Sequence, residues 1–404
     1  MQLLILRFCV GVGVGGSTVP FDIFAEFLPP SIRGRSLMLT NLFWTVGELY
    51  VIFAAYMLLP DYGWRGLVFS SAAPVTIGAL LTFWILPESP RWLITQGRYK
   101  EAEDIVRQCA ESSSTKPAPF TFDPAKKFPG RGGSKELVDD ISPRESSSAD
   151  AVDTSSNKSL YALVCEHFVH TLKVYSDLLT GEKLRVTTLK IGSVWAIFGF
   201  AYYGVVLLIT RIYQSKAPSD AAPHANSNAV CAFDYASIAV NTSSEFFSIL
   251  GVMLIIDRIG RRSSQIGTYG AGAVALVVMG SVPLRSQTPS TILMLGYIMR
   301  MTSMASSCTT WVVTPELYPT NVRASAHSLV NTFARLGALC SPFLVVSTIP
   351  TTTVAFVLGM CNILAAIAAW SLHETMGKAM DDDPKVGDDE TQKVLVVDNP
   401  IVKA

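Results

Sequence analysis

One motif occurs twice in this chain, at positions 290 residues apart. Glu26-Phe-Leu-Pro-x-x-x-Arg33 recurs as Glu316-Leu-Tyr-Pro-x-x-x-Arg323, with the same spacing from glutamate to arginine. The match continues into the apolar segment behind each copy, where the same residue types stand at Asn41, Phe43, Gly47 and Leu49 and at Asn331, Phe333, Gly337 and Leu339. A repeat over this distance predicts that the chain folds as two structurally similar halves.

The segments around the motif are long and apolar. Half of the residues are hydrophobic and only 16% are charged, which is unusual for a soluble domain. Runs of about twenty apolar residues have the length that crosses a hydrocarbon core. The sequence therefore predicts an all-α membrane protein with about nine transmembrane helices, near 6–28, 37–59, 66–86, 190–212, 235–256, 264–284, 291–314, 326–348 and 353–372.

The distribution of Lys and Arg predicts how these helices are oriented. Fourteen basic residues fall in the turns and flanks of one side and four in those of the other. Because cytoplasmic loops carry the excess of positive charge, both copies of the motif and the C-terminus are expected in the cytoplasm and Met1 outside. The chain is thus predicted to be a multi-pass membrane protein, and the choice between plasma membrane and vesicular membrane stays open.

Composition excludes several function classes. The net charge is zero and the basic residues are spread among turns, which gives no footprint for nucleic acid. Of seven cysteines only Cys231 lies in a clear outer loop, so no disulfide framework is expected. No metal-ligand spacing, phosphate loop or nucleophile motif stands out, and we expect no metal, no cofactor and no enzyme activity. The expected partners are a small-molecule substrate, a coupled proton or other ion, and the lipid bilayer; the chain is expected to be a monomer.

Charge and composition divide the chain into four parts. Residues 1–86 hold three expected membrane helices, residues 190–374 hold six, and residues 375–404 form a cytoplasmic tail. The connector 87–189 begins with an amphipathic helix near 97–110 and ends with a short helix near 161–179 that is expected at the membrane face. Between them, the Ser-rich part 112–159 has too few apolar residues to bury and is expected to be disordered.

Several stretches together resemble the major facilitator superfamily of transporters. Arg33-Gly-Arg35 after the first motif copy, Pro87-Glu-Ser-Pro-Arg91 and Asp257-Arg-Ile-Gly-Arg261-Arg stand in the family's order, as do Pro315-Glu-Leu-Tyr-Pro and Glu374-Thr. Stretches such as Phe43-Trp-Thr-Val-Gly-Glu48 and Ala334-Arg-Leu-Gly337 are most similar to the organic ion transporters and the synaptic-vesicle-protein-related transporters. The resemblance implies two pseudo-symmetric bundles of six helices.

The N-terminal bundle is incomplete by that comparison. The first expected helix matches the family's fourth, so helices one to three have no counterpart here. A truncated gene model or fragment is the expected explanation. If nine helices were the whole product, the usual mechanism of transport would be in doubt.

The resemblance assigns charged side chains on the cytoplasmic side to a gate that holds the two bundles together while the substrate site faces outward. Solvated turn charges are the alternative, and they explain the arginines but not the matched glutamates. The expected gate residues are Glu26, Arg33, Glu88, Arg91, Asp257, Arg258, Arg261, Glu316, Arg323 and Glu374.

Four charged residues stand deep inside apolar runs: Glu48, Glu245, Arg300 and Arg335. A charge at the bilayer centre costs about 2.5 kcal/mol or more, so each is expected to face a cavity or a partner. Arg335 is the candidate for binding an organic anion, because guanidinium presents a planar fork to a carboxylate. Glu48 or Glu245 could carry a proton, or Glu245 could form an internal ion pair with Arg300 or Arg335. Aromatic candidates for the cavity wall include Trp44, Tyr202 and Tyr203.

The predicted function is therefore secondary active transport of a small organic ion by alternating access, with a weak lean to anions. A sugar-porter-like carrier is one alternative, although the Gln-rich motif of hexose carriers is missing. The other is a non-transporting membrane protein that keeps the fold.

Overall fold

A computed structural model describes residues 1–95, 97–112, 160–181, 184–214, 234–283, 287–320 and 322–378 of the chain. Every regular element among them is helical, as the sequence predicts. The segment 113–159, for which disorder is expected, and the tail beyond residue 378 lie outside the described residues.

The first expected membrane helix is broken into three pieces. Helix α1 spans Gln2–Gly15, a 3-10 turn spans Gly16–Thr18, and α2 spans Val19–Phe27. Pro20 stands in the first turn of α2, where its missing N–H would have no helical partner and where its fixed φ suits the start of a helix. Helix α2 ends at Phe27, next to the first copy of the repeated motif.

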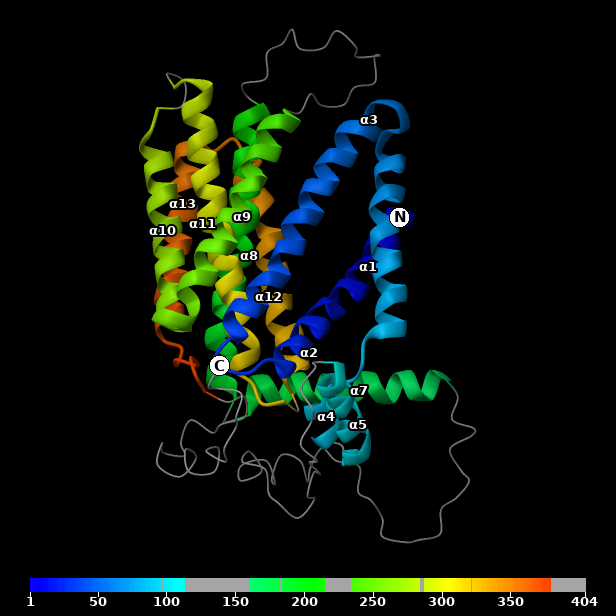
Figure 1. Cartoon of the computed structure of the whole chain (residues 1–404). Helices are drawn as coiled ribbons and strands as arrows, with labels where there is room; N and C mark the ends of the chain where they lie inside the picture. Colours follow the sequence, from blue (N-terminus) through cyan, green and yellow to red (C-terminus); the bar gives the residue numbers. More distant parts are fainter. Residues whose placement is uncertain are drawn as a thin grey trace, which may run out of the picture.

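The second and third expected helices form one long element, α3, over Arg33–Ile85. Its backbone leaves the helical region at Gly63, where φ is 61°, a conformation that favours glycine. Figure 1 shows the chain rising along the first arm of α3 and returning along the second. The two arms correspond to the expected helices 37–59 and 66–86.

Six helices follow the connector, and their ends lie within five residues of the predicted ones. They are α8 (Arg185–Gln214), α9 (Tyr235–Ile259), α10 (Arg261–Ser281), α11 (Pro289–Glu316), α12 (Arg323–Val345) and α13 (Thr351–Trp370). Side-chain caps stabilise the N-termini of two of these helices. Asp234 accepts a hydrogen bond from the N–H of Ser237 at the start of α9, and Thr288 accepts one from the N–H of Thr291 at the start of α11.

By length and hydropathy, six helices among the described residues could cross a membrane, against the nine expected. One difference arises because α3 counts once although its backbone turns back at Gly63. The others are α10 and α11, which have 21 and 28 residues but are rich in Ser, Thr and Gly. Both pack against neighbouring helices and bury many of their side chains, so they need less apolar surface.

Helices α8 and α12 approach each other through two glycines. A Cβ at Gly199 would lie 2.1 Å from the carbonyl oxygen of Ala334, and a Cβ at Gly337 would lie 2.1 Å from that of Ala196. Only glycine permits this backbone contact. The contact brings Trp195 and Tyr202 on α8 close to the face of α12 that carries His327 and Arg335.

Three further helices cover one end of the molecule. Helices α4 (Pro90–Thr95), α5 (Tyr99–Ser112) and α7 (Leu160–Thr180) lie below the membrane-length helices in Figure 1. Helices α5 and α7 coincide with the amphipathic and membrane-face helices predicted in the connector. Both motif copies lie at this end, which is called the inner end below.

Candidate functional site

The two copies of the motif exchange partners at the inner end. Glu26 of the first copy pairs with Arg323 of the second, and Arg33 of the first copy lies 3.7 Å from Glu316 of the second. All four side chains are at least 93% buried. Each motif therefore supplies one charge to each of two bridges between the N-terminal and C-terminal halves.

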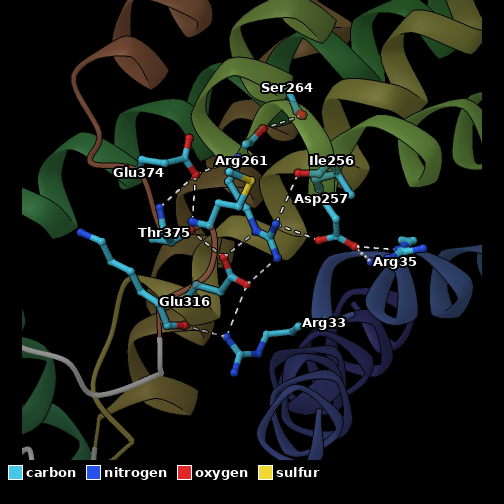
Figure 2. Close-up of polar contacts among 12 residues, drawn as sticks. Arg33, Arg35, Ile256, Asp257, Arg261, Ser264, Glu316, Glu374 and Thr375 are labelled. Carbon is cyan, nitrogen blue, oxygen red and sulfur yellow. Dashed lines mark hydrogen bonds and ion pairs between the residues drawn. The ribbon is translucent and has the colours of Figure 1, made fainter. Parts of the chain in front are cut away.

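Glu316 is the centre of a wider network, which Figure 2 shows. Its carboxylate lies 3.2 Å from Nε of Arg261 and accepts from the hydroxyl of Thr375 at 2.6 Å. Arg33 also donates to the backbone carbonyls of Leu28 and Lys378. The network thus links α3 to α10, α11 and the segment after α13.

A third contact between the halves runs through Asp257. Its carboxylate lies 2.8 Å from Arg261 and accepts from both the backbone N–H and the guanidinium of Arg35, at 3.0 and 3.2 Å. A Cβ at Gly34 would lie 2.4 Å from Oδ1 of Asp257. A larger residue at this position would therefore displace the Asp257 carboxylate from its contacts.

Glu374 stabilises the inner end in a different way. Its carboxylate accepts from the backbone N–H groups of Arg261 and Arg262, at 2.8 and 3.0 Å. These groups are the unpaired donors at the start of α10, where a negative charge is favoured. Gly260, with φ 93°, makes the turn that exposes them.

Most of the predicted gate residues come together, and some do not. Glu88 and Arg258 are exposed and lie outside this network, while Arg91 is half-buried. Three members were missed by the sequence reasoning: Arg35, Thr375 and Ser89, which donates to Glu26. Ser89 and Thr375 lie in short non-helical segments and Arg35 lies in the first turn of α3, and the sequence alone does not show that these side chains meet the gate residues.

Three of the deep charges form one cluster between the halves. Arg300 on α11 pairs with Glu48 on α3, and its Nε lies 2.7 Å from Glu245 on α9. The hydroxyl of Tyr202 lies 3.4 Å from a carboxylate oxygen of each glutamate. Thr45 donates to Glu245 at 3.0 Å. Of the two ion pairs left open for Glu245, the structure therefore contains the one with Arg300.

Arg335, the fourth deep charge, stands apart from this cluster. It is exposed at the edge of a cavity of about 350 Å³ and donates to the hydroxyl of Tyr203 at 3.0 Å. The cavity wall comes from both halves, and seven of its sixteen lining residues are aromatic. Its residues include Phe21, Asn41, Trp44, Trp195, Phe198, Tyr202, Tyr203, Trp311, Asn331 and Arg335.

The cavity and the charged cluster share side chains. Trp44 lines the cavity and donates from its indole to Glu48 at 3.0 Å, and Tyr202 lines it beside both glutamates. The guanidinium of Arg300 lies 5.5 Å from the centre of the Tyr202 ring. The predicted cavity residues thus form one site with an arginine at one edge and a mixed-charge cluster at another. No group of side chains suited to a metal ion occurs in the part of the chain that the structure describes.

Replacing Arg300 by methionine is expected to lower the free energy of unfolding by about 3–5 kcal/mol, because it leaves the buried carboxylate of Glu245 without its cation. Thermal unfolding in detergent measures the change as a lower midpoint. Adding Glu245→Gln should recover part of it, since the amide removes the unpaired charge. An unchanged midpoint in Arg300→Met would contradict this account of the cluster.

Comparison with known proteins places the fold. Residues 1–342 match the Major Facilitator Superfamily. The chain belongs to this superfamily. The match covers both copies of the motif and confirms the predicted two-bundle membrane fold.

Relatives within the superfamily are those that the sequence resemblance favours. The chain is 28% identical over 391 residues to the synaptic vesicle 2-related protein of Rattus norvegicus, across 94% of this chain and 62% of that protein. It is 29% identical over 365 residues to the organic cation/carnitine transporter 7 of Arabidopsis thaliana, across 86% and 67%. The chain thus spans about 62% of the length of the first of these relatives.

Solved structures of the superfamily share the fold. The proton:xylose symporter XylE bound to 6-bromo-6-deoxy-D-glucose aligns with a TM-score of 0.59 and 20% sequence identity, over 90% of this chain and 69% of that one. At this level of identity the likeness shows the fold alone.

Proposed function

We propose that this chain is part of a secondary active transporter that moves a small organic ion by alternating access. The observation that carries the proposal is the crossed pairing of Glu26 with Arg323 and of Arg33 with Glu316, which closes the inner end below an aromatic cavity formed by both halves. When these bridges part, the cavity opens to the cytoplasm. The expected orientation, with the C-terminus in the cytoplasm, puts that opening on the inner side.

The side chains of the cavity favour an organic ion over a sugar. Aromatic rings such as Trp44, Trp195 and Tyr203 provide faces for stacking, and Arg335 provides an exposed guanidinium beside them. A carboxylate is the group that Arg335 suits best. The relative named as an organic cation/carnitine transporter supports the wider class of organic ions.

Counterflow in proteoliposomes tests the proposal. The purified chain is loaded with an unlabelled compound inside and exchanged against the same labelled compound outside, with benzoate as an anion, tetraethylammonium as a cation, carnitine as a zwitterion and xylose as a sugar. A carrier accumulates many equivalents of label per protein for at least one organic ion. Label that never exceeds one equivalent per protein identifies a binding protein and overturns the proposal.

Arg335→Gln is expected to weaken exchange of benzoate about 10- to 100-fold, because a hydrogen bond to a charged group contributes about 1.5–3 kcal/mol. Arg65→Gln is the matched control, since Arg65 lies over the ring of Trp64 outside the cavity lining. The half-saturating benzoate concentration measures the effect. Equal loss in both variants would show that Arg335 does not bind the substrate.

A further inference from the structure

A buried acid–base pair lies between the cavity and the inner bridges. Nδ1 of His327 on α12 lies 2.6 Å from Oδ1 of Asp22 on α2. The side chains are 0% and 3% exposed. The pair joins the two halves, since the partners are 305 residues apart.

The position of the pair follows from helix geometry. Asp22 precedes Glu26 by four residues on α2, and His327 follows Arg323 by four residues on α12, so each lies about one helical turn from the inner bridge. Above the pair, Phe21, Trp195 and Trp311 line the cavity with rings 5.1–6.1 Å from the imidazole. A substrate that leaves the cavity towards the inner end must therefore separate Asp22 from His327.

Both partners keep a second polar atom without a hydrogen bond. Oδ2 of Asp22 and Nε2 of His327 are buried and have no hydrogen-bond partner among the described residues. A buried polar group without a partner is costly and calls for an explanation. An imidazole nitrogen in this position is a place where a proton can be gained.

The charged groups around the pair determine how a bound proton changes the net charge of this interface. On α2 and α12 these are Glu26 and Arg323, which neutralise each other. From α8 and α11 the groups in contact with the imidazole are the uncharged rings of Trp195 and Trp311, and beside the pair the hydroxyls of Thr18 and Ser328 bond across the halves at 3.0 Å. With a neutral imidazole the four ionisable groups carry a net charge of −1, and with imidazolium they carry none.

We propose that Asp22 and His327 form a proton-binding site that couples proton movement to the opening of the inner end. A proton from the outer solution reaches the pair through the cavity and binds to the imidazole, which removes the uncompensated charge from the apolar interface. When the halves part, both groups become solvated. Water then replaces the apolar surroundings that favoured the neutral pair, so the imidazole releases its proton to the inner solution.

The coupling role rests on the proposed transport, but the site makes its own prediction. Protonation should favour the joined, inner-closed state, and deprotonation should favour the open one, because a ligand shifts an equilibrium towards the state that binds it better. Glu48 and Glu245, the candidates from the sequence, are already paired with Arg300. Arg323, the cation that acts on Asp22, is itself paired with Glu26, which favours the Asp22–His327 pair as the proton site.

Distances across the inner end test the proposal. Spin labels at Ser31→Cys and Ser263→Cys mark exposed inner-end positions, one in each half, in a chain whose native cysteines are replaced by serine. In nanodiscs, the open population of the native pair is expected to rise about tenfold from pH 5.5 to pH 8, because the closed state binds the proton more tightly than the open state. A distance distribution that stays unchanged over this range overturns the site without any variant.

Variants assign the effect to the pair. His327→Gln and Asp22→Asn should each remove the pH dependence while keeping a polar side chain. His373→Gln is the matched control, because His373 lies outside the pair and burial, aided by Lys378 and Lys190, lowers its pKa. Retained pH dependence in His327→Gln overturns the proposal. If counterflow occurs but the distances do not depend on pH, the proton site is refuted and the proposed transport stands. If the distances depend on pH but no counterflow occurs, the proposed transport is refuted and the proton site stands.

Discussion

Arg323→Ala is expected to abolish counterflow while the protein still reaches the membrane. The substitution leaves the carboxylate of Glu26 buried without its cation, which costs about 3–5 kcal/mol. It also removes the hydrogen bonds from Arg323 to the carbonyls of Pro315 and Tyr318, at 3.0 and 3.2 Å, which shape the turn before α12. Since each 1.4 kcal/mol is about tenfold in an equilibrium, the inner-closed state would lose nearly all of its population.

Two further variants test whether the loss of counterflow is specific to the bridge. Arg258→Ala removes an exposed guanidinium from the same inner end and should leave counterflow close to native. The double variant Glu26→Arg with Arg323→Glu reverses the bridge and should restore part of the activity. Membrane fractionation and counterflow are measured on each protein. Normal transport in both Arg323→Ala and Glu316→Ala would refute the gate.

Gly199→Ala is expected to destabilise the chain by about 1–3 kcal/mol or more, although alanine favours helices over glycine by about 1 kcal/mol. The new methyl group would overlap the carbonyl oxygen of Ala334, a backbone atom that cannot rotate away. The helices α8 and α12 would have to separate, and the aromatic wall of the cavity with them. The midpoint of thermal unfolding and the monodisperse fraction in detergent measure the effect.

Gly267→Ala is expected to change the stability in the opposite direction. No atom lies within 4 Å of a Cβ at Gly267, which is exposed on α10. Alanine there gains helix propensity at no steric cost and should raise the midpoint slightly. A Gly199→Ala protein that is as stable as Gly267→Ala would disprove the close packing of α8 on α12.

The sequence predicted the helices well because their lengths and apolar runs are local properties. The six helices after the connector differ from prediction by a few residues. The 3-10 turn at Gly16–Thr18 was missed, as was the extension of the first arm of α3 through Pro60 to the turn at Gly63, because both depend on packing between helices. Periodicity and hydropathy do not contain that information.

The sequence predicted which residues belong to the candidate site but not which of them pair with each other. The repeated motif identified Glu26, Arg33, Glu316 and Arg323, yet nothing in one copy indicates that its charges pair with those of the other copy. Asp22 stands out in the sequence as an acidic residue near the end of an apolar run, where a charged side chain is expected to have a partner. His327 gave no such signal, since a single histidine in a helix is common, and only the packing of α2 against α12 joins the two.

The exchanged bridges at the inner end also describe a symmetry. The glutamate of each motif meets the arginine of the other, so the contact is isologous, the kind that two identical subunits make across a two-fold axis. A half-length chain with one copy of the motif could form both bridges by pairing with a second copy of itself. In this chain the two halves are covalently joined, so a substitution in one half must be compensated in the other half and not within its own motif.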